Sequence, residues 1–139
     1  MSNTELTRLN KIMPYLYPNL TNNMDNGDYY LQNDGNGTYL VWTNDHTSKP
    51  TDQELADAKE EGLNDGWWKL LRRERDKLLV ASDWSQGTDV PSDIKTPWAT
   101  YRNDLRNLPT TISKPSFETL NSQEDSEWLA NFVMPTKPK

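Results

Sequence analysis

The residues best suited to chemistry in this sequence are the oxygen-bearing side chains of the loop Asn33–Gly37. Its sequence, Asn-Asp-Gly-Asn-Gly, offers ligands of the kind that calcium prefers. The spacing differs from that of an EF-hand, because no acid-x-acid-x-acid-glycine frame fits and no glutamate closes the loop. The same residues are typical of a tight turn, since they tolerate a positive φ angle. We therefore interpret Asn33–Gly37 as a turn, and the sequence predicts no metal site and no cofactor.

Groups for acid–base or nucleophilic catalysis are present but are not arranged for it. His46, the one histidine, stands in a polar loop, which favours an ordinary surface residue. The chain has 21 aspartates and glutamates, yet no recognisable pocket places two of them together, so a glycosidase-type reaction has no support. The chain contains no cysteine and hence no thiol nucleophile. The sequence predicts no catalytic residue, and we expect that the protein is not an enzyme.

Charge and hydropathy restrict the partners. The net charge is -6 and the isoelectric point is about 4.7, so the chain lacks the basic field that nucleic acid or an acidic membrane attracts. We find no signal peptide, and no apolar run approaches the ~20 residues that a membrane span needs. The sequence therefore predicts a soluble, cytosolic protein whose partners are other proteins, not nucleic acid or membrane.

Two amphipathic segments between Trp67 and Leu108 form the predicted centre of the fold. Six apolar residues of the first segment share one helical face: Leu63, Trp67, Leu70, Leu71, Leu78 and Ala81. The second segment repeats apolar residues at helical spacing: Ile94, Trp98, Tyr101, Leu105 and Leu108. Two such stripes with a short polar connection predict an antiparallel helical hairpin, in which Leu71 faces Leu105 and Leu79 lies near Trp98.

Capping residues and glycines predict where the first helical region begins and bends. Thr51 and Glu54 have the spacing of a capping box, so a helix is expected to begin there. Gly62 and Gly66 each cost a helix about 1 kcal/mol relative to alanine. We therefore expect a break or bend over residues 62–65.

Prolines predict the ends of the second helix. Ser92 and Thr96 can both act as its N-cap, and Pro97 favours Thr96, because proline is well tolerated at the first helical position. Pro109 is expected to end this helix, since proline restricts the residue before it.

The remaining segments predict a small hairpin and two arms. Asp28–Thr43 is rich in aromatic and β-branched residues around the Asn-Asp-Gly-Asn-Gly turn, as in a β-hairpin. A short helix is expected over Thr4–Met13, where Pro14 would stop it, followed by an extended arm. In the C-terminal tail, Ser122 is a candidate cap of one short helix. The predicted class is α+β, mainly α, with an N-terminal arm over 1–27, a central domain over 28–109 and a docking tail over 110–139.

Large apolar residues sort into partner-binding and core groups. Those on the arms, with Trp68 of the first helix, are expected to bind other chains: Tyr15, Tyr17, Leu20, Trp68, Trp128, Leu129 and Phe132. For Trp68, coverage by the β-hairpin is an equal alternative. The expected structural core comprises Trp67, Leu71, Glu74, Leu78, Trp84, Trp98, Tyr101, Arg102 and Leu105. Within it, Glu74 falls on the apolar face and should accept a hydrogen bond from Arg102 or the Tyr101 hydroxyl.

The central segments also carry a specific pattern. Its parts are Arg72-x-Glu74-Arg75-Asp76-x-Leu78-Leu79, Ser82-Asp83-Trp84, Pro91 and Trp98-x-x-Tyr101-Arg102-x-x-Leu105-Arg106-x-Leu108-Pro109. This pattern resembles the phage tail assembly chaperone-like domain of tailed bacteriophages. The ending Met134-Pro135-Thr136-Lys137-Pro138 is similar to the closing Trp-Pro-x-x-Pro of that family, with methionine in place of tryptophan. The turn at Gly87-Thr88 and Pro97 depart from the family pattern.

The resemblance implies a non-enzymatic function in a phage tail. The favoured hypothesis is a structural or adaptor component of the virion tail, assembled in the host cytoplasm, that binds other tail or tail-fibre proteins through its arms and exposed aromatic residues. The alternative is a transient assembly chaperone that is absent from the mature virion. Copies of the chain itself remain open as further partners.

Overall fold

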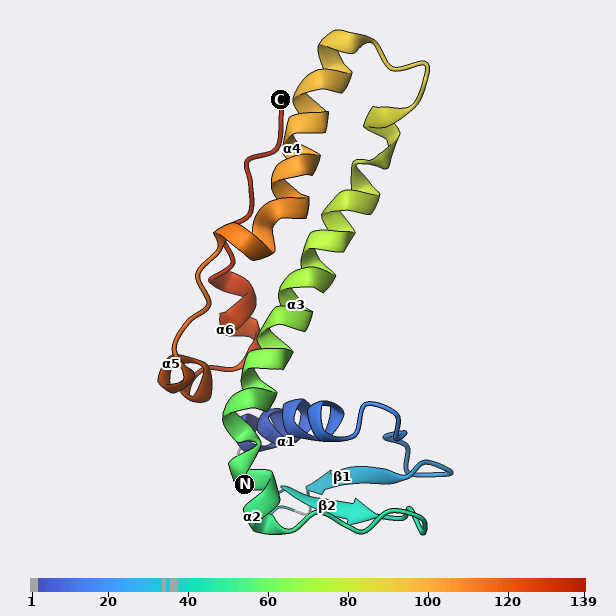
Figure 1. The fold of residues 1–139 in the computed structure, drawn as a ribbon, viewed down its shortest axis with the longest axis vertical. Coiled ribbons are helices and arrows are strands. Elements are labelled where there is room, and N and C mark those ends of the chain that lie inside the picture. The colour runs from blue at the N-terminus through green and yellow to red at the C-terminus, as the bar shows by residue number, and fades with distance from the viewer. Residues whose placement is uncertain (1–2, 34, 36–37) are drawn as a thin grey trace. The chain divides into compact units, whose positions relative to one another are not determined.

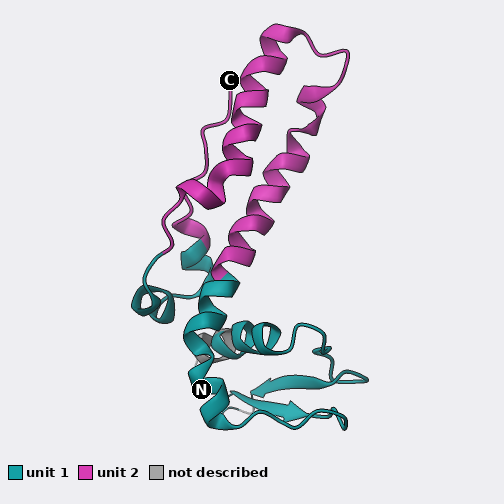
Figure 2. Cartoon of the chain, in the orientation of Figure 1, with its two compact units in different colours: residues 1–66, 115–128 teal, residues 67–114, 129–139 magenta. Residues whose placement is uncertain are grey.

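Helices dominate the chain. The computed structural model describes residues 3–33, 35 and 38–139, with side chains from residue 8 onward. The structure is 57% helical and includes one antiparallel two-stranded sheet, which confirms the predicted α+β, mainly α class (Figure 1). The chain divides into unit 1, residues 1–66 with 115–128, and unit 2, residues 67–114 with 129–139 (Figure 2). Helix α3 (Lys59–Ala81) supplies residues to both units.

Unit 1 contains the N-terminal helix, the sheet and two short helices. Its elements are α1 (Asn3–Leu16), β1 (Tyr29–Asn33), β2 (Thr38–Trp42), α2 (Asp52–Asp57), the start of α3, α5 (Phe117–Ser122) and the start of α6 (Asp125–Ala130). One apolar cluster is built around buried Met13, Tyr29 and Leu40. Packed against it are Tyr17, Leu20, Leu31, Trp42 and Leu55. The sheet is therefore anchored to α1 through aromatic packing.

The predicted β-hairpin is present. Strands β1 and β2 pair antiparallel from Tyr29 opposite Trp42 to Asn33 opposite Thr38. Gly35 has φ +94°, and its N–H donates to Asn33 Oδ1 at 2.9 Å, which is a local asparagine turn. The other residues of the predicted turn and of the weighed calcium loop, Asp34, Asn36 and Gly37, lie outside the described residues.

Asp28 ties the base of this hairpin to the preceding loop. Its carboxylate accepts the Thr21 N–H at 2.7 Å and the Asn44 side-chain amide at 2.8 Å. The Thr21 bond, and then the Asn44 bond, lower the pKa of Asp28 below its ordinary value of 3.8, because both favour the charged form.

A depressed pKa makes the stability of unit 1 sensitive to acid. Folding stabilises the charged form of Asp28. The contribution of this carboxylate to the free energy of unfolding is therefore complete at neutral pH. We expect that contribution to decline from about pH 5 downward and to vanish below the folded pKa of Asp28. Unfolding midpoints of the wild-type chain and Asp28→Asn, measured from pH 7 to pH 2, test this. The gap between the two should narrow with acid, and a constant gap would contradict the expectation.

The first helical region begins as predicted but breaks elsewhere. Thr51 caps α2 and exchanges both capping-box hydrogen bonds with Glu54. The break falls at Ala58, between α2 and α3, so the prediction of a bend at residues 62–65 is wrong. Gly62 lies inside α3, where it is needed for packing within unit 1. A Cβ atom on Gly62 would stand 3.0 Å from the Ile12 Cα atom, so glycine here permits α1 to lie close to α3.

We expect Gly62→Val to lower the free energy of unfolding by about 1–3 kcal/mol, the usual cost of overpacking a tight contact. Denaturant unfolding followed by circular dichroism measures it. Gly87→Ala is the matched control, because a Cβ there meets its nearest atom, the Trp84 carbonyl oxygen, at an ordinary 3.6 Å. A loss for Gly62→Val no larger than that for Gly87→Ala would mean that the close approach of Ile12 does not constrain this position.

Both predicted arms are partly built into unit 1. Arg8 of α1 is buried, and its Nη2 donates to the carbonyls of Leu120 at 3.0 Å, Gln123 at 2.8 Å and Asn121. Lys11 of the same helix pairs with Asp125 at 2.9 Å. Segment 115–128 is therefore held by the chain's own N-terminal helix.

Several predicted helix ends on these segments are wrong. Helix α1 continues through Pro14 to Leu16, since burial of Ile12 and Met13 outweighs one lost backbone donor. Ser122 is the last residue of α5, and its Oγ donates to the Thr119 carbonyl of that helix at 2.9 Å, so it does not begin a helix. Ser116 caps α5 by accepting the Thr119 N–H at 3.3 Å.

Unit 2 is an antiparallel helical hairpin with an added C-terminal segment (Figure 1). Helix α3 ends at Ala81, the 3-10 turn η1 (Asp83–Gln86) follows, and α4 (Ser92–Thr111) returns. Helix α4 begins at Ser92, not after the predicted cap Thr96, and contains both Pro97 and Pro109, so Pro109 does not end it. Packing explains the difference. Trp98, Tyr101 and Leu105 form a buried cluster, with Leu78 and Leu79 against it.

Candidate functional site

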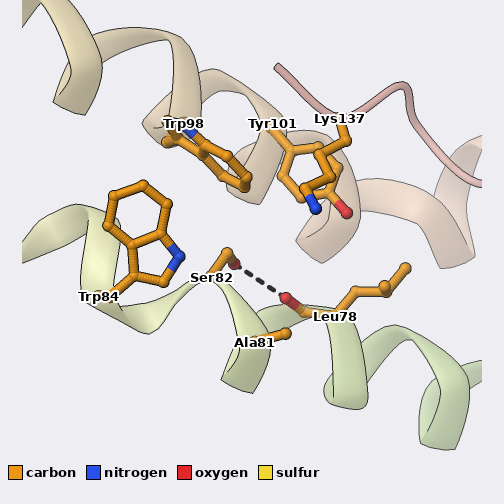
Figure 3. A pocket seen from close by; sticks show the side chains of 7 residues that line it. All are labelled: Leu78, Ala81, Ser82, Trp84, Trp98, Tyr101 and Lys137. Atoms are coloured by element: carbon orange, nitrogen blue, oxygen red, sulfur yellow. Dashed lines mark hydrogen bonds between the residues drawn. The ribbon is translucent and has the colours of Figure 1, made fainter. Parts of the chain in front are cut away.

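A hollow in unit 2 lies where α3 passes into η1. Its cavity of about 170 Å³ is lined by Leu78, Ala81, Ser82, Trp84, Trp98, Tyr101 and Lys137. We call this set the aromatic groove. Figure 3 shows Trp84 and Trp98 together on one side of the groove, and Lys137 reaching toward Tyr101 from the extended C-terminal segment. Its lining is mainly apolar, which suits an apolar or aliphatic ligand group.

Three aromatic rings form the walls of the groove. The centroid of Trp98 lies 5.1 Å from that of Trp84 and 5.6 Å from that of Tyr101, both with edge contacts. Trp98 and Tyr101 are buried as predicted, but Trp84 is 55% exposed. Trp84 was expected in the structural core, but it lies on η1 beyond the end of α3, where its ring makes an edge contact with Trp98 and stays largely exposed.

Arg102 supports the groove from α4. Its Nη1 donates to the Leu79 carbonyl at 2.6 Å and to Ser82 Oγ at 2.8 Å, and its Nη2 pairs with Asp83 at 2.8 Å. Leu79 is in the last turn of α3, where carbonyls have no partner inside the helix. Arg102 thus caps α3 from the neighbouring helix and fixes η1 against α4.

The predicted hydrogen bond between Glu74 and Arg102 or Tyr101 is absent. Glu74 instead accepts from Lys77 at 3.0 Å and from Arg73 at 3.3 Å, both on its own helix. Its side chain is 23% exposed, and the Lys77 bond is the main cause of a lowered pKa. The prediction failed because it assumed two facing helices, whereas Glu74 borders a second hollow that the C-terminal segment helps to form.

That second hollow, of about 360 Å³, is lined by Glu74, Lys77, Leu78, Leu129, Phe132 and Met134. The ring of Phe132 meets Trp67 edge-on, with centroids 5.4 Å apart. Leu78 lines both hollows, so the C-terminal segment follows one continuous seam of unit 2 from Phe132 to Lys137. This arrangement adds a third element to the helical hairpin.

The residues predicted to bind partners are scattered. Tyr17 and Leu20 pack on the cluster of unit 1, and the Tyr15 hydroxyl donates to Glu61. Trp68 is partly exposed, with its ring against Trp67 and under Arg72 at 5.8 Å. Leu129 is 39% exposed. Partner binding by these residues stays a prediction.

Trp128 departs most from its predicted setting. It is 0% exposed, with Lys11 Nζ 5.6 Å from its ring centroid, so it is not the exposed anchor that the tail pattern suggested. The start of α6, which carries Trp128, belongs to unit 1. There Lys11 of α1 pairs with Asp125, and Arg8 of α1 donates to the carbonyl of Gln123 just before the helix.

The described residues can be compared with the requirements of a metal site and of a membrane-spanning helix. Among them, no group of three or more metal-ligating side chains is placed to hold an ion. None of the helices they form is long and apolar enough to cross a membrane.

A known protein family matches the C-terminal half of the chain. The family described as phage tail assembly chaperone protein matches residues 68–139, just over half of the chain. The chain belongs to this family. The match includes the aromatic groove, Arg102 and the C-terminal segment, and it confirms the resemblance carried by the sequence pattern. No curated protein and no solved structure matches the chain.

Membership of the tail assembly chaperone family gives the protein a role related to phage tails. The predicted core residues Trp98 and Tyr101 prove to line the groove, but sequence reasoning missed the roles of Ser82 and Lys137. Ser82 Oγ donates to the Leu78 carbonyl at 2.9 Å and accepts from Arg102. The available signal for Lys137 was the Pro-x-x-Pro ending, which marked the family without indicating what the segment contacts.

Proposed function

We propose that the protein is a non-enzymatic assembly chaperone that binds another tail or tail-fibre protein transiently, in the host cytoplasm. Family membership supports a role in tail assembly. The observation that carries the binding role is Trp84, a large aromatic residue 55% exposed at the rim of an apolar groove. Tryptophans in such positions often dominate protein–protein binding energy.

The contacts of the arms favour a transient chaperone over a virion component. In the virion hypothesis, the arms bind other tail or tail-fibre proteins, and such binding can order segments that are loose alone. In this chain, Arg8 and Lys11 bind segment 120–125 within unit 1. These segments therefore have partners inside one copy of the protein, and neighbours in a particle are not required to hold them.

Mass spectrometry of purified tail particles tests the proposal directly. We expect the protein to be absent from mature particles and present in cross-linked complexes with a tail protein isolated from cells during assembly. Stoichiometric presence in mature particles would overturn the transient role and support a structural component.

Trp84→Ala tests the binding surface. Because Trp84 is largely exposed, we expect its loss to change the free energy of unfolding by no more than about 1 kcal/mol. Loss of a binding hot spot should nevertheless reduce the tail protein that co-purifies with the chain by about tenfold or more. Val80→Ala, at another exposed apolar residue, is the control. Equal co-purification with both variants would contradict a role for the groove.

A further inference from the structure

The aromatic groove already contains part of the chain. Lys137 lines it, and its Nζ lies 5.8 Å from the centroid of the Trp98 ring, a cation–π distance. Pro135 and Pro138 flank this lysine and are both partly buried. Lys137 itself remains exposed to solvent. The segment 134–139 is thus an extended, proline-flanked lysine sequence whose lysine lies against an aromatic ring of the groove.

This combination corresponds to a known mode of peptide recognition. Proline-rich segments favour an extended polyproline conformation and dock in grooves lined by aromatic residues, because little conformational entropy is lost. The walls of the groove, Trp84, Trp98 and Tyr101, provide such a surface. The lysine between the prolines adds attraction to the ring faces.

The resident segment is held weakly. Within the described residues, the backbone of 133–139 makes no hydrogen bond to the rest of the chain. Its attachment is through side chains, chiefly Met134 in the second hollow and Lys137 in the groove. Val133, which precedes the segment, is 79% exposed. A segment held in this way can leave its seam without unfolding α3 or α4.

We propose that the aromatic groove accepts an extended, proline-flanked lysine segment of a partner protein, which displaces the chain's own residues 134–139 from the same place. The proposal rests on the proposed function in that the partner is a tail protein under assembly. The chemistry of the occupant is taken from the segment now seated there. Charge supports the choice, because the chain carries a net charge of -6 and the segment is basic.

Competition by the chain's own segment sets the expected binding behaviour. While residues 134–139 occupy the groove, only the open fraction of the protein can bind a second segment, so the apparent affinity falls by that fraction. Weakening the resident segment should therefore strengthen binding in trans. If residues 134–139 were purely structural, weakening them would not strengthen the binding of a second segment.

The test uses the full chain and a synthetic acetylated peptide with the sequence of Met134–Lys139. Binding is followed by nuclear magnetic resonance of the tryptophan indole N–H groups. We expect the peptide to bind the triple variant Pro135→Ala, Lys137→Gln, Pro138→Ala roughly tenfold more tightly than the wild-type chain, the effect of a groove occupied about 90% of the time. Lys139→Gln, which removes the same charge outside the groove lining, should behave as wild type.

Two further experiments identify the groove and the occupant. Trp84→Ala, placed on the triple variant, should abolish peptide binding, and a peptide with glutamine in place of its lysine should bind less tightly. No indole shift with any chain, or equal affinity for wild type and the triple variant, overturns the proposal. A concentration-dependent dimer of the wild-type chain, lost in the triple variant, also overturns it by making a second copy the occupant.

These results are separable from those for the proposed function. One outcome is that the peptide fails to bind while Trp84→Ala still reduces co-purification of the tail protein. That result would support the chaperone role and contradict a proline-flanked lysine segment as the ligand. If the peptide binds but mature particles contain the protein stoichiometrically, the groove assignment stands and the transient role falls.

Discussion

Replacing Trp128 by alanine is expected to lower the free energy of unfolding by about 3–5 kcal/mol, the usual cost of truncating a fully buried tryptophan. The side chain is 0% exposed. Lys11 lies over its ring, so packing and a cation–π contact are lost together. Equilibrium unfolding in urea, followed by both fluorescence and circular dichroism, measures the loss.

Val133→Ala provides the comparison, because it removes apolar atoms from a residue that is 79% exposed and should change stability by no more than about 0.5 kcal/mol. The contrast decides between two roles for Trp128. A residue that anchors partners would tolerate the substitution in the isolated chain and lose partner binding. An unchanged unfolding midpoint for Trp128→Ala would therefore support the partner-binding role that the sequence predicted for this residue.

Features set by neighbouring residues were predictable from the sequence. Thr51 and Glu54 contain all the atoms of their capping box within one helical turn. The hairpin of β1 and β2 follows from aromatic and β-branched residues on both sides of a glycine-containing turn. The apolar spacing of Trp98, Tyr101 and Leu105 likewise predicted the face that α4 buries.

Features set by distant residues were not predictable. Gly62 was expected to weaken α3, but its function is to admit Ile12 from α1, which is far away in the sequence. Pro97 and Pro109 were expected to mark the ends of α4, yet the buried face between them keeps the helix continuous. In each case tertiary packing, with several kcal/mol available from buried side chains, exceeded a local preference of about 1–3 kcal/mol.

In the groove, too, local features were predictable from the sequence and contacts between distant residues were not. Its aromatic walls were recognised as large apolar residues on predicted helices, whereas Lys137 arrives from the C-terminal segment and could not be placed without a structure. Arg102 was recognised as a core residue but was assigned the wrong partner. The facing rule for two helices relates side chain to side chain, and it ignores the backbone carbonyls in the last turn of α3, which have no partner inside the helix. The Leu79 carbonyl is the acceptor that the rule could not supply.

Arg102→Met is expected to lower the free energy of unfolding by about 2–3 kcal/mol, because hydrogen bonds from a charged group are lost while most of the packing is kept. The substitution removes the donors to the Leu79 carbonyl and Ser82 Oγ, together with the ion pair to Asp83. Arg102→Lys should recover only part of this loss, since an ammonium group cannot reproduce the fork of a guanidinium. Urea unfolding of the three chains measures these differences.

Double-mutant cycles identify the partners of Arg102. Ser82 accepts from Arg102 at 2.8 Å, so Ser82→Ala and Arg102→Met should couple by about 0.5–3 kcal/mol, the range for residues in one network. Glu74 bonds only to Lys77 and Arg73 among the described residues, so Glu74→Ala and Arg102→Met should be additive within about 0.5 kcal/mol. Strong coupling to Glu74 and none to Ser82 would mean that Arg102 fixes the register of the two helices through a carboxylate. In that case its role as a cap on α3 would be wrong.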